Sequence, residues 1–247
     1  ETDRRRGRKE LALMRRLIVA VCLVSAPAGA GPCMVQQLVP QSMTSQGTVI
    51  EDGGGVMVHA GLGEDPGGAR LPDVTHQTAW RFRDGTKLVA PTIDTIAPGL
   101  SVYRLPATGA NLVLENDKHV AITRVTRSAD RGAALLPAPM PTSIDWERRT
   151  SFRSSTDLVT VHLIAPAPAH AAAMIVYGPD KVARSWGVVT RGGKDVIAYE
   201  TGGRCSMAIP GNTSSNVGDH VTVAWVDASG RVSAASRDLE VTAAKTP

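Results

Sequence analysis

The stretch HVTVAWVDASGRVSAASRDLEVT at residues 220–242 decides the fold class. Its first part alternates with the period of two that a β-strand requires, which places Val221, Val223 and Trp225 on one face. Residues 227–230, DASG, have the composition of a tight turn, and a second apolar alternation follows at 239–242. The stretch therefore predicts two β-strands at the C-terminus, separated by a turn and a Ser-rich segment.

This C-terminal pattern resembles the last two strands of bacterial fibronectin type III or immunoglobulin-like modules. In those modules an alternating strand runs into an Asp-x-x-Gly turn, a Ser-rich segment and a final strand. Arg231 stands where Asn is common in the family. The resemblance covers about 25 residues. It implies a β-sandwich used for adhesion, spacing or binding, and it implies no catalytic residue.

The rest of the chain after residue 31 has the same strand and turn pattern, with short runs rich in Val, Ile and Thr separated by Gly, Pro, Asp and Asn. Four pairs of runs flank turn-like residues and are predicted to be hairpins. The turns lie at 52–55 (DGGG), 84–85 (DG), 116–118 (NDK) and 178–181 (GPDK). The fold class expected is all-β, with two immunoglobulin- or fibronectin-like sandwich domains after a signal peptide.

The domain division rests on Pro137, Pro139 and Pro141, because closely spaced prolines favour an extended linker. We expect a leader and signal peptide at 1–30, an N-terminal β domain at 31–135, a linker at 136–145, and a C-terminal sandwich at 146–247. The C-terminal part offers about seven or eight short strands, as an immunoglobulin-like sandwich does. The alternative is one larger sandwich with a long internal loop.

An export signal is the strongest feature near the N-terminus. Arg15 and Arg16 precede the apolar run LIVAVCLVS at 17–25, and the AGA at 28–30 fits a cleavage site. The run is too short to span a bilayer, and a buried core helix is the alternative. We therefore expect a periplasmic, cell-surface or secreted protein, with no membrane span in the mature chain. The Ala, Gly, Val and Arg usage is typical of a high-GC bacterium.

The charge balance changes once this leader is set aside. The chain has 27 basic and 23 acidic residues, of which residues 1–30 hold seven and three, so 20 of each remain. A mature chain with no net charge offers no bulk field for nucleic acid or anionic lipid. We expect a protein or cell-surface partner of unknown identity, and no nucleic acid.

Two cysteines, Cys33 and Cys205, remain in the mature chain. An even pair in an oxidising compartment predicts one disulfide, which would join the mature N-terminus to the C-terminal half. A lipid-anchored Cys33 and a nucleophilic Cys205 with a distant His are the alternatives.

Catalytic and cofactor motifs are absent from the sequence. There is no Gly-x-Ser-x-Gly, His-Glu-x-x-His, Cys-x-x-Cys, P-loop or EF-hand loop, so neither a cofactor nor a metal is expected. No pair among the histidines has metal-ligand spacing, although a site assembled in space stays open. The histidines are His59, His76, His119, His162, His170 and His220.

A pair of facing carboxylates is the remaining enzymatic hypothesis, because glycosidases need two. The candidates that lie near predicted strands are Asp145, Glu147, Asp157 and Glu200. Trp146, just after the Pro-rich segment, is the candidate contact residue for a partner, and a plug between domains is its alternative role.

The sequence thus favours an exported non-enzymatic protein, acting as an interaction, adhesion or structural module of the cell envelope. The alternative is a secreted or periplasmic hydrolase with a dispersed active site. The two hypotheses differ in whether histidines and carboxylates converge in a cleft.

Overall fold

The computed structural model describes residues 38–62, 80–116, 119–131, 134–150, 155–202 and 215–244. These residues are all-β and form sixteen strands, which confirms the expected fold class at that level. Within them, no helix has the length and apolar character needed to cross a membrane. The predicted signal sequence at 14–30, Cys33, His76 and Cys205 lie outside the described residues, so the predictions for them stay open.

The N-terminal region consists of two sheets. A four-stranded sheet has the order β1-β3-β7-β6 and a five-stranded sheet the order β2-β9-β8-β4-β5. The strands are β1 (Leu38–Ser42), β2 (Thr48–Asp52), β3 (Gly55–Leu62), β4 (Arg81–Asp84), β5 (Lys87–Val89), β6 (Thr92–Ala97), β7 (Leu100–Arg104), β8 (Asn111–Glu115) and β9 (Ala121–Arg131).

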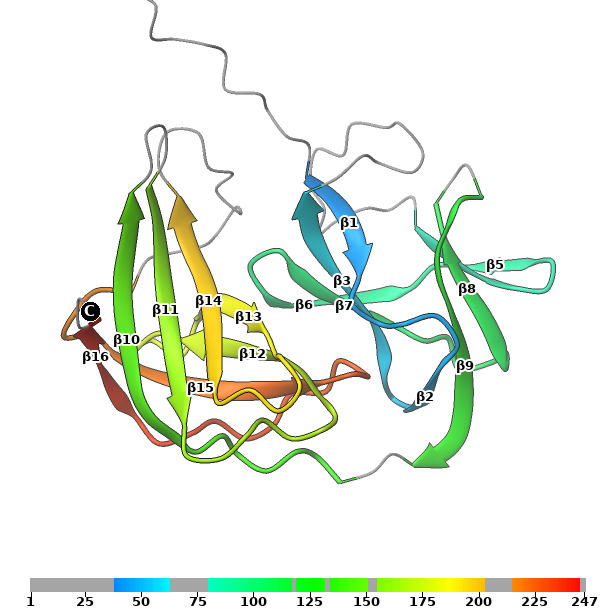
Figure 1. Ribbon diagram of the computed structural model, residues 1–247. Coiled ribbons are helices and arrows are strands. Elements are labelled where there is room, and N and C mark those ends of the chain that lie inside the picture. Colours follow the sequence, from blue (N-terminus) through cyan, green and yellow to red (C-terminus); the bar gives the residue numbers. More distant parts are fainter. Residues whose placement is uncertain are drawn as a thin grey trace, which may run out of the picture. The chain divides into compact units, whose positions relative to one another are not determined.

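The C-terminal region is a seven-stranded sheet that closes into a barrel, in the order β10-β11-β14-β13-β12-β15-β16. Its strands are β10 (Pro141–Thr150), β11 (Ser155–Leu163), β12 (Ala171–Tyr177), β13 (Ala183–Val188), β14 (Asp195–Gly202), β15 (His220–Asp227) and β16 (Leu239–Ala243). The shortest pairings in the barrel are the single pair Trp186–Tyr199 between β13 and β14 and the two pairs between β15 and β16, and β10 closes on β16 through a parallel pairing of three residues. Figure 1 shows β10, β11 and β14 side by side.

Three of the four predicted hairpins are confirmed. Antiparallel pairs join β4 to β5, β8 to β9 and β12 to β13 across the expected turns. The hairpin around residues 52–55 is wrong, because β2 and β3 belong to different sheets. Strand β2 instead pairs in parallel with β9, and β3 pairs with β1 and β7.

The C-terminal strands predicted at 220–242 are present as β15 and β16. Val221, Val223 and Trp225 point into the barrel core, as their alternation required. The turn is also present, since the Gly230 amide donates to the Asp227 carbonyl at 2.9 Å and Gly230 has a φ of 73°. The Ser-rich segment between the two strands makes one isolated bridge, between Val226 and Val232.

The Pro-rich segment differs from the prediction at its end. Strand β10 begins at Pro141, so residues 141–145 belong to the barrel and not to a linker. Proline is tolerated as the first residue of a strand because its missing N–H is not required there. The placement of a domain boundary before this strand stays a prediction.

Three apolar clusters hold the sheets together. One fills the barrel, with Ile144, Met174 and Trp225 among its members. A second lies between the two N-terminal sheets and contains Trp80, Phe82 and Tyr103. The third joins the outer face of the four-stranded sheet to the outer face of β12 and β15. Its buried members are Met57, Ala97, Leu100, Val102, Ala173, Ile175 and Val226.

The third cluster is reinforced by polar contacts between the two regions. The Trp186 indole N–H donates to the Pro98 carbonyl at 3.0 Å, and the Gly55 amide donates to the Ser229 carbonyl at 2.9 Å. Arg231 lies 3.0 Å from Glu51 and 2.7 Å from the buried Asp227. The central strands of the four-stranded sheet, β3 and β7, are therefore covered on both of their faces.

Candidate functional site

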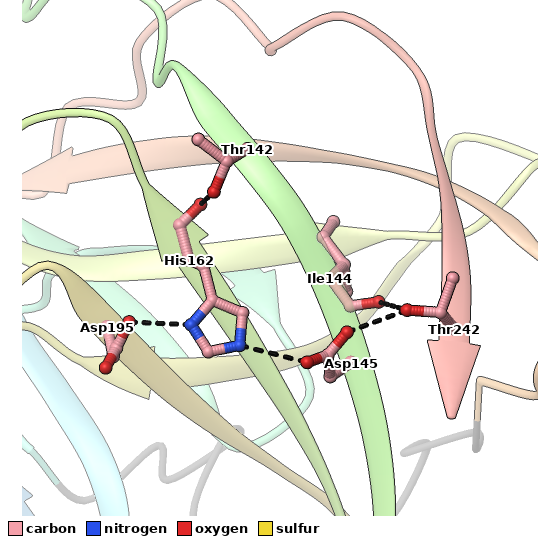
Figure 2. A network of polar contacts seen from close by, with 6 residues as sticks. All are labelled: Thr142, Ile144, Asp145, His162, Asp195 and Thr242. Carbon is pink, nitrogen blue, oxygen red and sulfur yellow. Dashed lines mark hydrogen bonds and ion pairs between the residues drawn. The ribbon is translucent and has the colours of Figure 1, made fainter. Parts of the chain in front are cut away.

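Histidine and carboxylates converge on the outer surface of the barrel around His162 (Figure 2). Along β11, Val159 and Val161 point into the barrel core, so the period of two turns His162 outward. Its Nδ1 lies 2.8 Å from Asp195 Oδ1 on β14, and its Nε2 lies 3.1 Å from Asp145 Oδ2 on β10. The imidazole therefore bridges two carboxylates across three neighbouring strands.

Thr242 extends this network to the last strand. Its hydroxyl lies 2.7 Å from Asp145 Oδ1 and 3.3 Å from the Ile144 carbonyl. This contact lies where β16 pairs in parallel with β10 and closes the barrel. The network thus ties β16, β10, β11 and β14 together, as Figure 2 shows.

The order of groups in the network is not that of a nucleophilic site. A catalytic hydroxyl must contact a ring nitrogen, and a carboxylate must hold the other nitrogen. Here the Thr242 hydroxyl contacts Asp145, and both nitrogens of His162 face carboxylates. A ring with a single N–H donates to one carboxylate, so only the imidazolium donates to both.

Metal chemistry is not indicated by the part of the chain that the structure describes. Among these residues no group of three or more His, Cys, Asp or Glu is placed to hold a metal ion. The His162 nitrogens are also directed at carboxylate oxygens within hydrogen-bond distance, rather than sharing a common point with them.

A second network surrounds Glu115, at the end of β8 in the five-stranded sheet. Its side chain is 1% exposed, and its oxygens lie 2.6 Å from Arg83 Nε and 2.8 Å from His119 Nδ1. Burial acts to raise the pKa of this carboxyl, but hydrogen bonds from His119 and Arg83 and their charges outweigh it and leave the pKa lowered. His119 itself lies in the turn after β8 and has a left-handed backbone, with φ of 60°.

The described residues line hollows large enough for a ligand, of which two are considered. One of about 540 Å³ lies at an end of the barrel and is lined in part by Tyr177, Lys181, His220 and Asp238. His220 there lies 3.0 Å from Asp238, and burial raises the pKa of the Tyr177 phenol.

The other hollow, of about 380 Å³, lies on the outer face of the five-stranded sheet. Its polar lining comes from Arg83, Asn111, Arg124 and Thr126, around the apolar Val113. We call the outer face of this sheet the open face, because Val49, Leu88 and Arg124 are exposed there.

Trp146, the predicted contact residue, lies on β10 and is half-buried against the core of the barrel. The Arg148 guanidinium lies 5.5 Å from the centre of its ring. Its indole N–H is buried, with no hydrogen-bond partner in the described structure. It packs within the barrel region, and its contact role stays a prediction.

Of the four candidate carboxylates, the three whose side chains the structure describes each contact groups other than one another. Asp157 accepts two hydrogen bonds from Arg148, and Glu147 lies 3.1 Å from Arg149. Asp145 belongs to the His162 network, and Glu200 lies on β14.

The other histidines that the structure describes are dispersed. His59 contacts Trp186 edge-on with ring centres 5.4 Å apart, and His170 lies in the turn before β12. His119 and His220 each contact a carboxylate, Glu115 and Asp238 respectively.

Sequence reasoning missed Asp195 as a partner of His162, Thr242 as a partner of Asp145, and Arg83 as a partner of Glu115. Each pair is far apart in sequence and meets only through strand pairing, for example His162 opposite Asp195. The available signal was the outward position of a polar residue on each predicted strand, which does not specify its neighbour on the next strand.

Comparison with known proteins identifies no family. No family model matches the chain, and no curated protein sequence matches it. One similar solved structure is a "Biofilm associated protein - BSP domain", which has 12% sequence identity and a TM-score of 0.28. The match covers 84% of this chain but 30% of that one, so this chain spans less than a third of that structure's length. Similarity at this level defines neither a shared fold nor a shared function.

Proposed function

We propose that the chain is an exported, non-enzymatic β-sandwich protein that serves as an interaction, adhesion or structural module of the cell envelope. The observation that carries this proposal is the contrast between the two N-terminal sheets. The central strands of the four-stranded sheet have both faces covered, whereas the five-stranded sheet presents exposed apolar and cationic side chains on its open face. A sheet with one packed face and one accessible face is suited to binding a partner.

The strand order of the barrel supports an immunoglobulin- or fibronectin-like assignment for the C-terminal region. Strands β10, β11 and β14 follow one another, and β13, β12, β15 and β16 follow one another. Seven strands arranged as two mainly antiparallel layers are expected of such a sandwich. The fold alone does not define the activity, so the functional proposal depends on the surfaces.

The arrangement at His162 supports a non-enzymatic role. A general base needs a ring nitrogen free to take a proton from a substrate or nucleophile. Both nitrogens of His162 instead contact carboxylates, on a surface where its side chain is 34% exposed. The network is better suited to bracing four strands than to proton transfer.

A hydrolase is the second candidate, and the His162 network is also the observation that favours it. It brings a histidine and two carboxylates together, as a dispersed active site would. Exposure to solvent and the absence of a hydroxyl at the ring are what weigh against it.

Incubation of the mature protein with isolated bacterial envelopes tests the two candidates. An interaction module co-sediments with the envelopes and releases no soluble fragments. Release of fragments that His162→Asn abolishes would instead establish the hydrolase. His220→Asn is the matched control, because His220 also pairs with a carboxylate at the surface.

Export is proposed on the signal sequence and on the predicted Cys33–Cys205 bond. Intact mass of the exported product is expected to show removal of the residues before about 31. Thiol titration of the native protein is expected to find neither cysteine free. A product that retains residues 17–25, or that carries two free thiols, contradicts these proposals.

A further inference from the structure

A single row of side chains crosses the open face over four of its five strands, β5, β4, β8 and β9. Leu88 on β5 lies opposite Arg83 on β4, and Arg83 lies opposite Val113 on β8. Val113 lies opposite Arg124 on β9, and the Gly47 amide before β2 donates to the Arg124 carbonyl at 2.8 Å. Their neighbours on the inner face, Phe82, Leu112 and Val125, are buried, so this row points outward.

The two arginines lie on either side of one strand. Neighbouring strands are about 4.8 Å apart, so the two backbone positions are about 10 Å apart and both long side chains reach over Val113. Both line the hollow of about 380 Å³ on this face. Two guanidinium groups around one apolar floor form a cationic binding surface.

The two arginines also differ in how far they are already neutralised. Arg83 donates a hydrogen bond from Nε to the buried Glu115, which leaves its two terminal nitrogens as donors for another ligand. Arg124 is exposed, and its guanidinium has no hydrogen bond or ion pair with any described residue. Arg104, Arg148 and Arg231, by contrast, all contact carboxylates. The charge of Arg124 is therefore available to a partner.

The remaining groups on this face fit a sugar chain. Asn111 and Thr126 lie opposite each other in the next row and present an amide and a hydroxyl that can bind sugar hydroxyls. Val113 and Leu88 offer apolar contact for ring faces, with Leu88 48% exposed. Trp80 and Phe82 lie on the inner face of the sheet. The described rows of the open face therefore contain no aromatic side chain on which a nucleic-acid base could stack.

From this juxtaposition we infer that the open face binds an acidic polysaccharide, with Arg83 and Arg124 pairing to carboxylates of the chain. Guanidinium groups pair with carboxylates through two parallel hydrogen bonds, which favours a polymer that carries acidic groups on its rings. An extended acidic peptide is expected instead at a sheet edge, where backbone groups are available, and not across the face. The inference deepens the proposed interaction function and rests on it.

Binding of polygalacturonate oligomers to the whole mature protein tests the inference. Binding is expected to weaken with added salt and to be lost with fully methyl-esterified oligomers, which keep the chain and lack the charge. Arg124→Gln is expected to lower the affinity about tenfold or more, the effect of losing a charged hydrogen-bonded contact. Arg191→Gln, an exposed arginine in the turn before β14, is the matched control and is expected to bind as the wild type does.

Three results overturn the inference. They are absence of binding, equal binding by Arg124→Gln and wild type, and tighter binding of polyglutamate than of polygalacturonate. Polymer length is followed in the same experiment, because shortening of the oligomers would instead contradict the non-enzymatic function. Failure of the inference and failure of the proposed function therefore give different readouts.

Discussion

The two N-terminal sheets share one core but differ on their outer faces. Val56 of the four-stranded sheet and Phe82 of the five-stranded sheet meet in the same cluster. Beyond that cluster, Met57 and Val102 are covered by Ile175 and Val226 of the barrel. The open face carries Val49, 59% exposed, and Leu88, 48% exposed. One sheet is thus a middle layer, and the other is a boundary between protein and solvent.

The difference is visible in the sequences of the strands. Strand β7 is buried along its first four residues, LSVY, because neighbouring side chains pack against different clusters. Strand β8, NLVLE, alternates between the buried Leu112 and Leu114 and the outward Asn111 and Val113. A run that is apolar on both faces therefore indicates a covered sheet, and alternation indicates a face left for solvent or a partner.

The largest expected effect comes from removing the cover of the middle layer. Ile175→Ala deletes fully buried atoms from the cluster that joins β12 to the four-stranded sheet. Urea unfolding is expected to show a loss of about 2–5 kcal/mol. Leu88→Ala on the open face is the control, with an expected change within about 0.5 kcal/mol. Equal losses in the two variants would mean that the sheets do not differ as described.

A smaller loss is expected at Gly230, in the turn that packs on the middle layer. A Cβ there would lie 2.7 Å from Val102 in a backbone with φ of 73°. Gly230→Ala combines a clash with left-handed strain, so a loss of about 2–4 kcal/mol is expected in thermal or urea unfolding. Gly218 has a φ of 92° and open space around it. Gly218→Ala is therefore expected to show the left-handed strain alone, a loss of about 1–2 kcal/mol. A Gly218→Ala loss as large as that of Gly230→Ala would rule out the contact.

Glu115, beside the open face, makes the stability of the five-stranded sheet depend on pH. Its lowered pKa means that the folded state favours the ionised carboxylate more than the unfolded state does. The pKa in the unfolded state is near 4.5. The stability it contributes is present above that value and is lost as the pH falls through the folded pKa. Glu115→Gln is expected to lose about 1–3 kcal/mol at pH 7. Between pH 6 and 3 its stability should fall less than that of the wild type, and a parallel decline would contradict the assignment.

The smallest effect is expected on the barrel surface. His162→Asn removes contacts whose groups are partly exposed, with Asp195 at 60%, and such pairs contribute about 0–1 kcal/mol. A loss above 2 kcal/mol in urea unfolding would show that the network is a structural requirement of barrel closure.

The sequence predicted the local elements of the fold better than their partners. The turns at 84–85, 116–118 and 178–181 were found because short turns with Gly, Asn or Asp join strands that pair directly. Residues 52–55 have the same composition but connect two sheets, which only the parallel pairing of β2 with β9 reveals. The sequence assigns the first residues of β10 to a linker, because Pro141 belongs to a run of closely spaced prolines and is also the first residue of the strand.

The candidate sites were less predictable than the fold. His162, Asp145 and Asp195 come from three strands, and their contact depends on the register of β10, β11 and β14. The same holds for Arg83 and Arg124, which lie on strands separated by β8. A single sequence shows that such residues point outward, and strand pairing decides which of them meet.

Oxidation of methionine side chains tests the central claim, that the central strands of the four-stranded sheet are covered on both faces. Met57 lies on the outer face of that sheet and is fully buried, Met174 is buried inside the barrel, and Met140 is 62% exposed. Brief treatment of the native protein with hydrogen peroxide, followed by peptide mass spectrometry, gives the rate at each position. We predict that Met140 is oxidised first and that Met57 is protected as strongly as Met174. Oxidation of Met57 at the rate of Met140 would contradict the account.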